Sequence, residues 1–359
     1  MPVHGSESAG KLALALALAL VSVRVLAIHS TQPVIPERYD DIDPLLSLTA
    51  LTARGFGAEV SLAPELGNAT TVVAGICAAL AQHSVLVFRG LGHRLSLLEH
   101  VAFCKQFSVV DPEVSRAPRY CTDGGVHVSA DTKEVKAADG VNPFGQTIRT
   151  ARLQQLKDGE PPEVFKVVTD PNDGLSFGEG FHTDLTFMQA PPSIGMAIAR
   201  LPSSPGTGDT LFLSMTEAYA SLPPANRSRI ANLWGIHDDN DGRRASHPVV
   251  RVVDNRTVLF VNGHFTRTLL SDPRGSDLHG AGGDGGYAEV LSGLKAHIES
   301  MEPLHIEWSE QDAVMWDERT TQHAAVHDYF GQHRRLDRVL VSGDVPVGLR
   351  DRELSGDAS

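Results

Sequence analysis

A stretch in the middle of the chain, Gly178 to Phe187, brings an imidazole and a carboxylate close together in sequence. His182 and Asp184 stand two residues apart within it. Leu185 to Phe187 mixes apolar, β-branched and aromatic residues, so we expect a loop that leads into a β-strand. Because side chains alternate along a strand, His182 and Asp184 would face the same way. They would supply two of the three groups in a 2-His-1-carboxylate triad for non-haem Fe(II), and a third ligand is still needed.

A second stretch, from Trp316 to Leu340, is rich in groups that bind anions or metals. Gly331 predicts a turn, after which the alternation of residues indicates a strand. Arg334 and Arg338 would then share one face of that strand. Guanidinium groups directed into a β-sandwich are costly unless they meet anions, so this pair points to anionic ligands.

The composition indicates which kinds of molecule the protein binds. The chain has 359 residues, 42% of them hydrophobic, and a formal net charge of −13. Such an acidic balance argues against a nucleic-acid-binding surface, and small molecules are the more natural partners. Cys77, Cys104 and Cys121 lack the spacing of a disulfide framework or a zinc site, so we expect reduced thiols. The sequence leaves the formation of a homo-oligomer open.

The amino-terminal segment 1–45 is predicted to be a poorly ordered extension. Its apolar run, Leu12 to Val23, is short for a membrane span and is followed by Arg24, so we expect no membrane anchor. Residues 1–27 could alternatively serve as a signal peptide, since Lys11 precedes the apolar run. We expect a cytoplasmic protein.

The rest of the chain alternates between short strands and a few helices. Apolar runs predict strands at 57–60, 85–88, 164–168, 194–199, 210–213, 304–308 and 313–316, and a hairpin over 249–261. Helical periodicity predicts helices at 72–83, 95–107, 218–233 and 287–301, the third of them interrupted by Pro223 and Pro224. This pattern favours a mainly β fold with peripheral helices (α+β), a β-sandwich or jelly roll.

We expect one domain over residues 46–348. Two weakly patterned segments interrupt it, an excursion at 111–162 and a Gly-rich loop at 271–286. A polar tail would follow at 349–359.

Several motifs occur in an order that resembles a known family. Phe181-His182-Thr183-Asp184-Leu185-Thr186-Phe187 is followed by Gly208-Asp209-Thr210-Leu211-Phe212, then by Trp316-Asp317, Thr321-Gln322-His323, Asp328-Tyr329 and the segment Arg334 to Arg338. Their order and spacing are similar to those of the taurine/2-oxoglutarate dioxygenase family, which also includes 2,4-dichlorophenoxyacetate dioxygenase. The likeness extends more loosely from Leu46 to Gly348.

The resemblance implies a double-stranded β-helix and specific roles for the motif residues. His182, Asp184 and His323 would bind Fe(II). Arg334, helped by the Thr210 hydroxyl, would hold the distal carboxylate of 2-oxoglutarate, and Arg338 would receive an acidic group of the primary substrate. Guanidinium groups suit carboxylates and sulfonates because they bind them in a bidentate manner.

The activity that the resemblance implies is that of an Fe(II)- and 2-oxoglutarate-dependent dioxygenase. Such an enzyme consumes O2, hydroxylates a small substrate and releases succinate and CO2. Taurine-cleaving members carry an Asn and a Trp where this chain has Gly178 and Phe181, and a His after the first helices that Ser108 to Asp111 does not supply. We therefore expect an anionic substrate other than taurine: a sulfonate, a sulfate ester or a carboxylate.

Alternatives remain for these residues and for the function. His327 or His333 could be the ligand instead of His323, and both arginines could pair with the neighbouring acidic residues Asp317, Glu318 and Asp337. Thr210 could be an ordinary strand residue, and Phe181 could line the substrate space or belong to the core. The rival functions are a catalytically inactive jelly-roll protein that binds a metal or anion and a zinc hydrolase, although the hydrolase would leave Arg334 and Thr210 unexplained.

Overall fold

A computed structural model describes residues 46–62, 69–107, 140–141, 147–148, 160–161, 163–169, 180–239, 243–271 and 287–349. The predicted extension at 1–45 and tail beyond residue 349 lie outside the described residues, as do Cys121, Gly178, nearly all of the 111–162 excursion and the 271–286 loop after Ser271. Cys77 and Cys104, which are described, are both free thiols. None of the described helices is long and apolar enough to cross a bilayer.

The largest sheet has seven strands and forms one wall of a sandwich. Its order is β1-β2-β3-β15-β7-β17-β6. The strands are β1 (Leu46–Ala50), β2 (Ala58–Leu62), β3 (Val85–Phe88), β15 (Ala313–Asp317), β7 (Ile194–Leu201), β17 (Arg334–Val341) and β6 (Phe165–Thr169). The central strands β3, β15 and β7 are mostly apolar, with Asp317 and Arg200 as their only charged residues, because both faces of the sheet are covered.

Alternate residues of these central strands enter two different cores. Val87, Ala197 and Val314 belong to a cluster with Phe212 and Trp308, which lies between the large sheet and a three-stranded sheet in the order β14-β8-β16. Strands β14 (Leu304–Ile306), β8 (Thr210–Ser214) and β16 (Thr321–Ala325) form that smaller wall. The two walls thus make the sandwich that holds the functional site.

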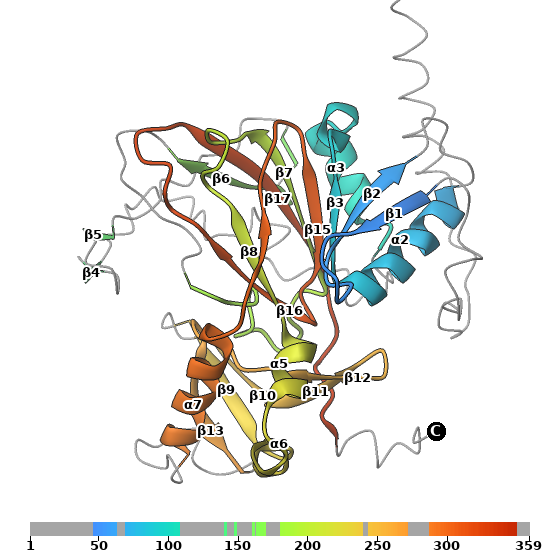
Figure 1. Ribbon diagram of the computed structural model, residues 1–359. Coiled ribbons are helices and arrows are strands. Elements are labelled where there is room, and N and C mark those ends of the chain that lie inside the picture. The colour runs from blue at the N-terminus through green and yellow to red at the C-terminus, as the bar shows by residue number, and fades with distance from the viewer. Residues whose placement is uncertain are drawn as a thin grey trace, which may run out of the picture.

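The other face of the large sheet is covered by helices. Leu86, Met196 and Met315 pack there against α2 (Ala69–His83) and α3 (Leu97–Cys104), which follows the short 3-10 helix η2 (Leu91–Arg94). Figure 1 shows these helices beside β1, β2 and β3. Ser96 caps the amino-terminal end of α3 and its side chain forms a capping box with Glu99, so the helix starts later than the predicted 95–107 helix.

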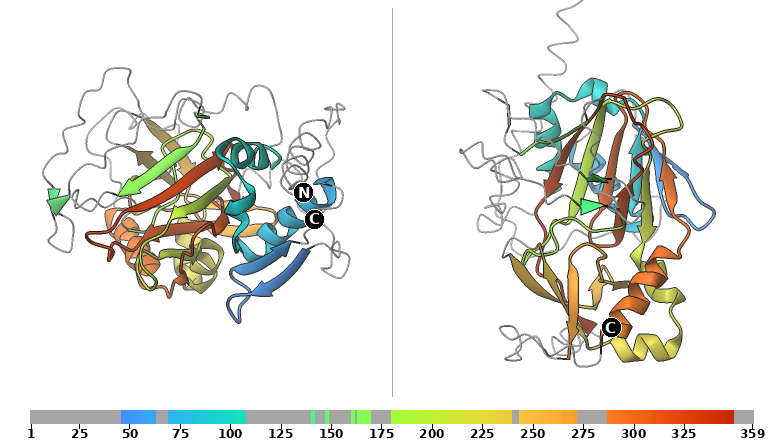
Figure 2. Two further views of the ribbon diagram at one scale, coloured as in Figure 1. Left: turned by 90° about the horizontal axis from the view of Figure 1, so that it is seen from above. Right: turned by 90° about the vertical axis from the view of Figure 1, so that its left-hand side faces the viewer.

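A second lobe lies at one end of the sandwich (Figures 1 and 2). It has its own apolar core. It comprises α5 (Met215–Ser221), α6 (Pro224–Ile230), α7 (Ala288–Glu299), the sheet β10-β9-β13 and the hairpin β11-β12. Its strands are β9 (Trp234–Asp238), β10 (Arg244–Pro248), β13 (Thr266–Leu270), β11 (Val250–Val253) and β12 (Arg256–Leu259). A further short antiparallel pair, β4 (Gly140–Val141) and β5 (Thr147–Ile148), forms a two-stranded sheet of its own.

The predicted mainly β architecture with peripheral helices is therefore confirmed. The helix predicted at 218–233 consists of two helices, because Pro223 and Pro224 interrupt it at the start of α6. The predicted hairpin turns at Asp254 and Asn255, both at positive φ, as a type I′ turn requires. Seven of the described strands were not predicted: β1, β4, β5, β9, β10, β13 and β16.

Candidate metal centre

The two histidines of the motifs meet through their backbones. The His182 N–H donates to the His323 carbonyl at 3.0 Å, and the His323 N–H donates to the His182 carbonyl at 2.8 Å. These reciprocal bonds make an isolated antiparallel bridge between the 180–190 loop and β16. The imidazole centroids are consequently 4.4 Å apart. The pairing brings together two residues that are far apart in the sequence.

The prediction of a strand at Leu185 to Phe187 is wrong, because the chain turns there. Leu185 has a φ of 50°, and the Met188 N–H donates back to the Leu185 carbonyl at 3.0 Å. The backbone carbonyls of this loop are bonded by a side chain and not by a neighbouring strand. His247 Nε2 lies 2.9 Å from the carbonyls of both Thr186 and Met188. His182 and Asp184 thus point the same way because they precede a turn that hydrogen bonds to His247 hold in place.

The three candidate ligands converge in the interior. His182, Asp184 and His323 each offer one atom to a group whose members all lie within 4.8 Å of one another. His182 Nε2 is 3.7 Å from Asp184 Oδ1. All three side chains are buried. Two imidazoles and a carboxylate are the donor set that suits non-haem Fe(II) with open positions for other ligands.

The tautomer of His182 fits a metal ligand. Its Nδ1 lies 2.9 Å from the Gly180 carbonyl, which can only accept, so Nδ1 carries the proton and Nε2 keeps its lone pair. His323 Nδ1 is buried and has no hydrogen-bond partner in the described part of the chain. Burial, followed by the neighbouring His182, lowers the pKa of His323 to about 3, so this imidazole is neutral near pH 7. These features fit a site built for a cation.

Asp184 is the anionic member of the group. Burial alone would raise its pKa, but the adjacent Arg338 guanidinium holds the pKa well below its ordinary value. Arg338 Nη1 donates to Asp184 Oδ2 at 2.6 Å. The guanidinium also lies over the Phe165 ring, 4.9 Å from its centroid. Arg338 therefore reaches the metal group itself, and the alternative that it pairs with Asp317, Glu318 or Asp337 does not hold.

Glu318 binds the backbone N–H of Asp184. Its Oε2 accepts the Asp184 N–H at 3.1 Å and its Oε1 accepts the Trp316 indole N–H at 2.6 Å. The side chain is fully buried, and burial together with the Asp184 carboxylate raises the pKa of Glu318 well above its ordinary value. Sequence reasoning considered Glu318 only as an ion-pair partner of the arginines.

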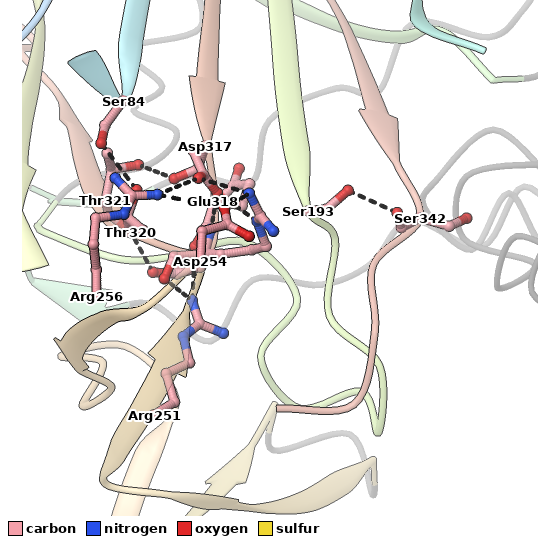
Figure 3. A network of polar contacts seen from close by, with 12 residues as sticks. Ser84, Ser193, Arg251, Asp254, Arg256, Asp317, Glu318, Thr320, Thr321 and Ser342 are labelled. Carbon is pink, nitrogen blue, oxygen red and sulfur yellow. Dashed lines mark hydrogen bonds and ion pairs between the residues drawn. The ribbon is translucent and has the colours of Figure 1, made fainter. Parts of the chain in front are cut away.

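A polar network fixes the turn between β15 and β16 (Figure 3). The Thr320 hydroxyl donates to Ser84 Oγ at 3.1 Å, and Thr321 Oγ1 donates to the Asp317 carbonyl at 2.8 Å. Arg251 donates to the carbonyls of Glu318 and Arg319. Because Ser84 directly precedes β3 and Arg251 belongs to β11, the turn is tied to the start of β3 and to the second lobe, which keeps His323 in register with His182.

Arg334 contacts the segment that leads into β8, the strand of Thr210. The Arg334 Nη2 donates to the Gly208 carbonyl at 2.9 Å, its guanidinium lies 5.0 Å from the Tyr329 ring centroid, and its buried Nε makes no hydrogen bond within the described residues. Thr210 pairs with Ala325 in register, two residues from His323, so their side chains share a face. Trp308 Nε1 donates to Thr210 Oγ1 at 3.0 Å, so the hydroxyl proton can be given to another acceptor.

The remaining predicted residues lie elsewhere. The His327 Nδ1 is 3.1 Å from the Tyr329 hydroxyl, and His333 is exposed; neither belongs to the metal group. The Phe181 side chain is half-buried and packs against the core of the second lobe. Its contribution to substrate binding stays a prediction.

The second lobe contributes residues that the motifs did not reveal. Asn262 is fully buried; its Nδ2 donates to the Thr183 carbonyl at 2.8 Å, and its Oδ1 accepts the N–H groups of His264 and Phe265. His237 Nδ1 is 2.8 Å from the Thr186 hydroxyl. The only sequence signal was the run Val261-Asn262-Gly263 after a strand, which by itself reads as a turn.

The family model for "Taurine catabolism dioxygenase TauD, TfdA family" matches residues 47–340. The chain belongs to this family.

Relatives of the TauD/TfdA family match the chain along most of its length. An alpha-ketoglutarate-dependent sulfate ester dioxygenase of Pseudomonas putida is 27% identical and covers 88% of this chain and 93% of its own. An alkylsulfatase of Acinetobacter baylyi is 28% identical, over 84% of this chain and 87% of the relative. A solved taurine dioxygenase from Burkholderia xenovorans aligns with a TM-score of 0.61 at 26% identity, over 86% of this chain and 95% of that one.

Membership of the TauD/TfdA family confirms the predicted fold and reaction class. The protein is a 2-oxoglutarate-dependent non-haem iron dioxygenase with a jelly-roll fold, and Fe(II) and 2-oxoglutarate are its cofactor and cosubstrate. The family match is close to the predicted domain of 46–348, whose bounds stay a prediction. When bound, the iron supplies the chemistry that couples oxidation of 2-oxoglutarate by O2 to attack on a substrate C–H bond.

Proposed function

We propose that this dioxygenase acts on alkyl sulfate esters, with His182, Asp184 and His323 as the iron ligands. The three side chains are buried and convergent, and the proton on His182 Nδ1 leaves Nε2 as a donor. Arg334 and Thr210 hold the distal carboxylate of 2-oxoglutarate. The buried Arg334 Nε has no hydrogen-bond partner in the described part of the chain, and a buried guanidinium favours an anionic ligand.

The observation that carries the substrate class is the position of Arg338. Its Nη1 lies 2.6 Å from Asp184 Oδ2, so its fork is next to the metal group, and the side chain is only 13% exposed. A guanidinium in such a place binds a sulfate or sulfonate with paired hydrogen bonds. Two relatives that cover more than four fifths of this chain are named as a sulfate ester dioxygenase and an alkylsulfatase, which favours the ester.

The proposed reaction explains how an oxygenase releases sulfate. Hydroxylation of the carbon that bears the ester oxygen gives R–CH(OH)–O–SO3⁻. The C–O bond to sulfate then breaks as the hydroxyl loses its proton, yielding an aldehyde and hydrogen sulfate. One 2-oxoglutarate and one O2 are consumed, and one succinate and one CO2 are formed. Arg338 would orient the sulfate so that the adjacent carbon faces the metal.

Arg338→Ala tests the substrate role. We expect KM for 1-hexyl sulfate to rise by roughly 10- to 100-fold, because a hydrogen bond to a charged group contributes about 1.5–3 kcal/mol. KM for 2-oxoglutarate should change little, and sulfate release should fall in parallel with succinate formation. The measurement is steady-state kinetics with each compound varied in turn.

Arg338 also touches Asp184, so a second variant is needed. Arg338→Lys keeps the positive charge but loses the planar fork, and we expect an intermediate KM for the ester with unchanged iron content. Equal losses for the ester and for 2-oxoglutarate in both variants would reject a separate substrate role. Turnover of carboxylates in preference to 1-hexyl sulfate would reject the sulfate class.

A further inference from the structure

A fourth imidazole lies beside the metal group without belonging to it. The His264 ring centroid is 5.0 Å from that of His182, with the two planes tilted by 33°. His264 is exposed, whereas His182 is buried. It comes from the second lobe, in the segment between β12 and β13. The second lobe therefore extends to the outer edge of the metal group.

The backbone of His264 is held firmly against the loop that carries His182 and Asp184. Asn262 Oδ1 accepts the His264 N–H at 2.9 Å and the Phe265 N–H at 3.2 Å. The same side chain donates through Nδ2 to the Thr183 carbonyl at 2.8 Å. One buried amide thus fixes the position of His264 relative to the metal group, while the imidazole itself stays at the surface.

Contacts of the residues on either side of His264 also hold this segment in place. The Phe265 ring meets the Phe187 ring edge to face, with centroids 5.1 Å apart. The Asn262 N–H donates to Thr266 Oγ1 at 2.8 Å. A side chain on a rigid support reaches a ligand with little loss of entropy, which is how binding residues are commonly placed.

His264 and Arg338 contact different residues of the metal group. Arg338 contacts Asp184 at 2.6 Å, and His264 lies over His182. Both are close enough to His323 to act on it electrostatically. A sulfate monoester has three non-bridging oxygens, so two of them can accept a bidentate guanidinium while the third accepts a hydrogen bond from a separate donor. A carboxylate offers only two oxygens.

We propose that His264 is a substrate-binding residue that donates a hydrogen bond to a non-bridging sulfate oxygen while Arg338 binds the others. This inference rests on the proposed function and extends it by naming a second contact to the same head group. It assigns His264 to the selection of sulfate esters over carboxylates.

Two substitutions separate hydrogen bonding from ring stacking. His264→Phe keeps an aromatic ring against His182 but removes the donor, and His264→Gln keeps a donor but removes the ring. The probe is 1-hexyl sulfate, titrated without oxygen into enzyme loaded with Fe(II) and 2-oxoglutarate and followed by calorimetry. His93→Phe, at an exposed histidine in η2, is the matched control.

We expect His264→Phe to raise Kd for 1-hexyl sulfate by roughly 10-fold or more, since one hydrogen bond to a charged group is lost. His264→Gln should recover most of the affinity, and Kd for hexanoate and for 2-oxoglutarate should be unchanged in both variants. Wild-type affinity in His264→Phe, or equal loss of 2-oxoglutarate binding in both variants, would overturn the inference. If the wild type binds no 1-hexyl sulfate, the inference and the proposed substrate fail together; if Arg338→Ala alone weakens binding, only the inference fails.

Discussion

His182→Ala should abolish 2-oxoglutarate turnover and lower the affinity for Fe(II) by more than about 100-fold. Loss of a residue that merely supports a metal ligand typically costs about 10–100-fold in metal affinity, and loss of a ligand should cost more. The effect should be confined to the metal, because His182 pairs with His323 through backbone atoms that the substitution retains. Metal content after equilibrium dialysis and the rate of succinate formation measure the two losses.

Two further variants guard against a trivial loss of folding. His182→Gln retains a polar side chain of similar length and should behave like His182→Ala. His93→Ala removes an exposed imidazole outside the metal group and should leave iron content and turnover unchanged. Full activity in a folded His182→Ala protein would refute the ligand assignment.

Arg334→Ala should raise KM for 2-oxoglutarate by roughly 10- to 100-fold, because it removes charge-assisted hydrogen bonds from a desolvated carboxylate. The side chain is only 2% exposed. Burial lowers the pKa of Arg334 below its ordinary value, and a bound carboxylate would offset the cost of keeping the charge there. Steady-state kinetics with 2-oxoglutarate as the varied compound gives the measurement.

The next residue on β17 provides the control. Arg335 faces the other way and pairs with Asp337 at 2.8 Å, so Arg335→Ala should leave KM for 2-oxoglutarate unchanged. Thr210→Val should cause a smaller rise than Arg334→Ala, since only the hydroxyl is lost. An unchanged KM in Arg334→Ala, or the same increase in Arg335→Ala, would place the cosubstrate elsewhere.

The sandwich was predictable because its strands are buried on both faces. The runs at 85–88, 194–199 and 313–316 contain no charged residue, and each became a central strand of the large sheet. Apart from the predicted hairpin β11-β12, the strands of the second lobe were not predicted, because they are short and carry polar residues such as His237 and Ser246. In β9, for example, the buried His237 lies 2.8 Å from the Thr186 hydroxyl through its Nδ1 and interrupts the apolar pattern by which strands are recognised.

The metal group was predicted from motifs, but its geometry was not. The sequence indicated a strand for Leu185–Phe187 because β-branched and aromatic residues favour strands. In the structure, Asn262 and His247 bond to carbonyls of this loop, and no local pattern reports contacts from so far along the chain. The positions of His264 beside His182 and of Glu318 behind the Asp184 N–H were not predicted for the same reason, since they depend on tertiary neighbours.

Anaerobic titration of the protein with Fe(II) and then 2-oxoglutarate, followed by visible absorption, tests the iron site most directly. The account predicts a weak charge-transfer band that saturates at one iron per chain, disappears in His182→Ala and requires more 2-oxoglutarate in Arg334→Ala. A wild-type protein that develops no such band, and forms no succinate when oxygen and sulfate esters are supplied, would contradict it.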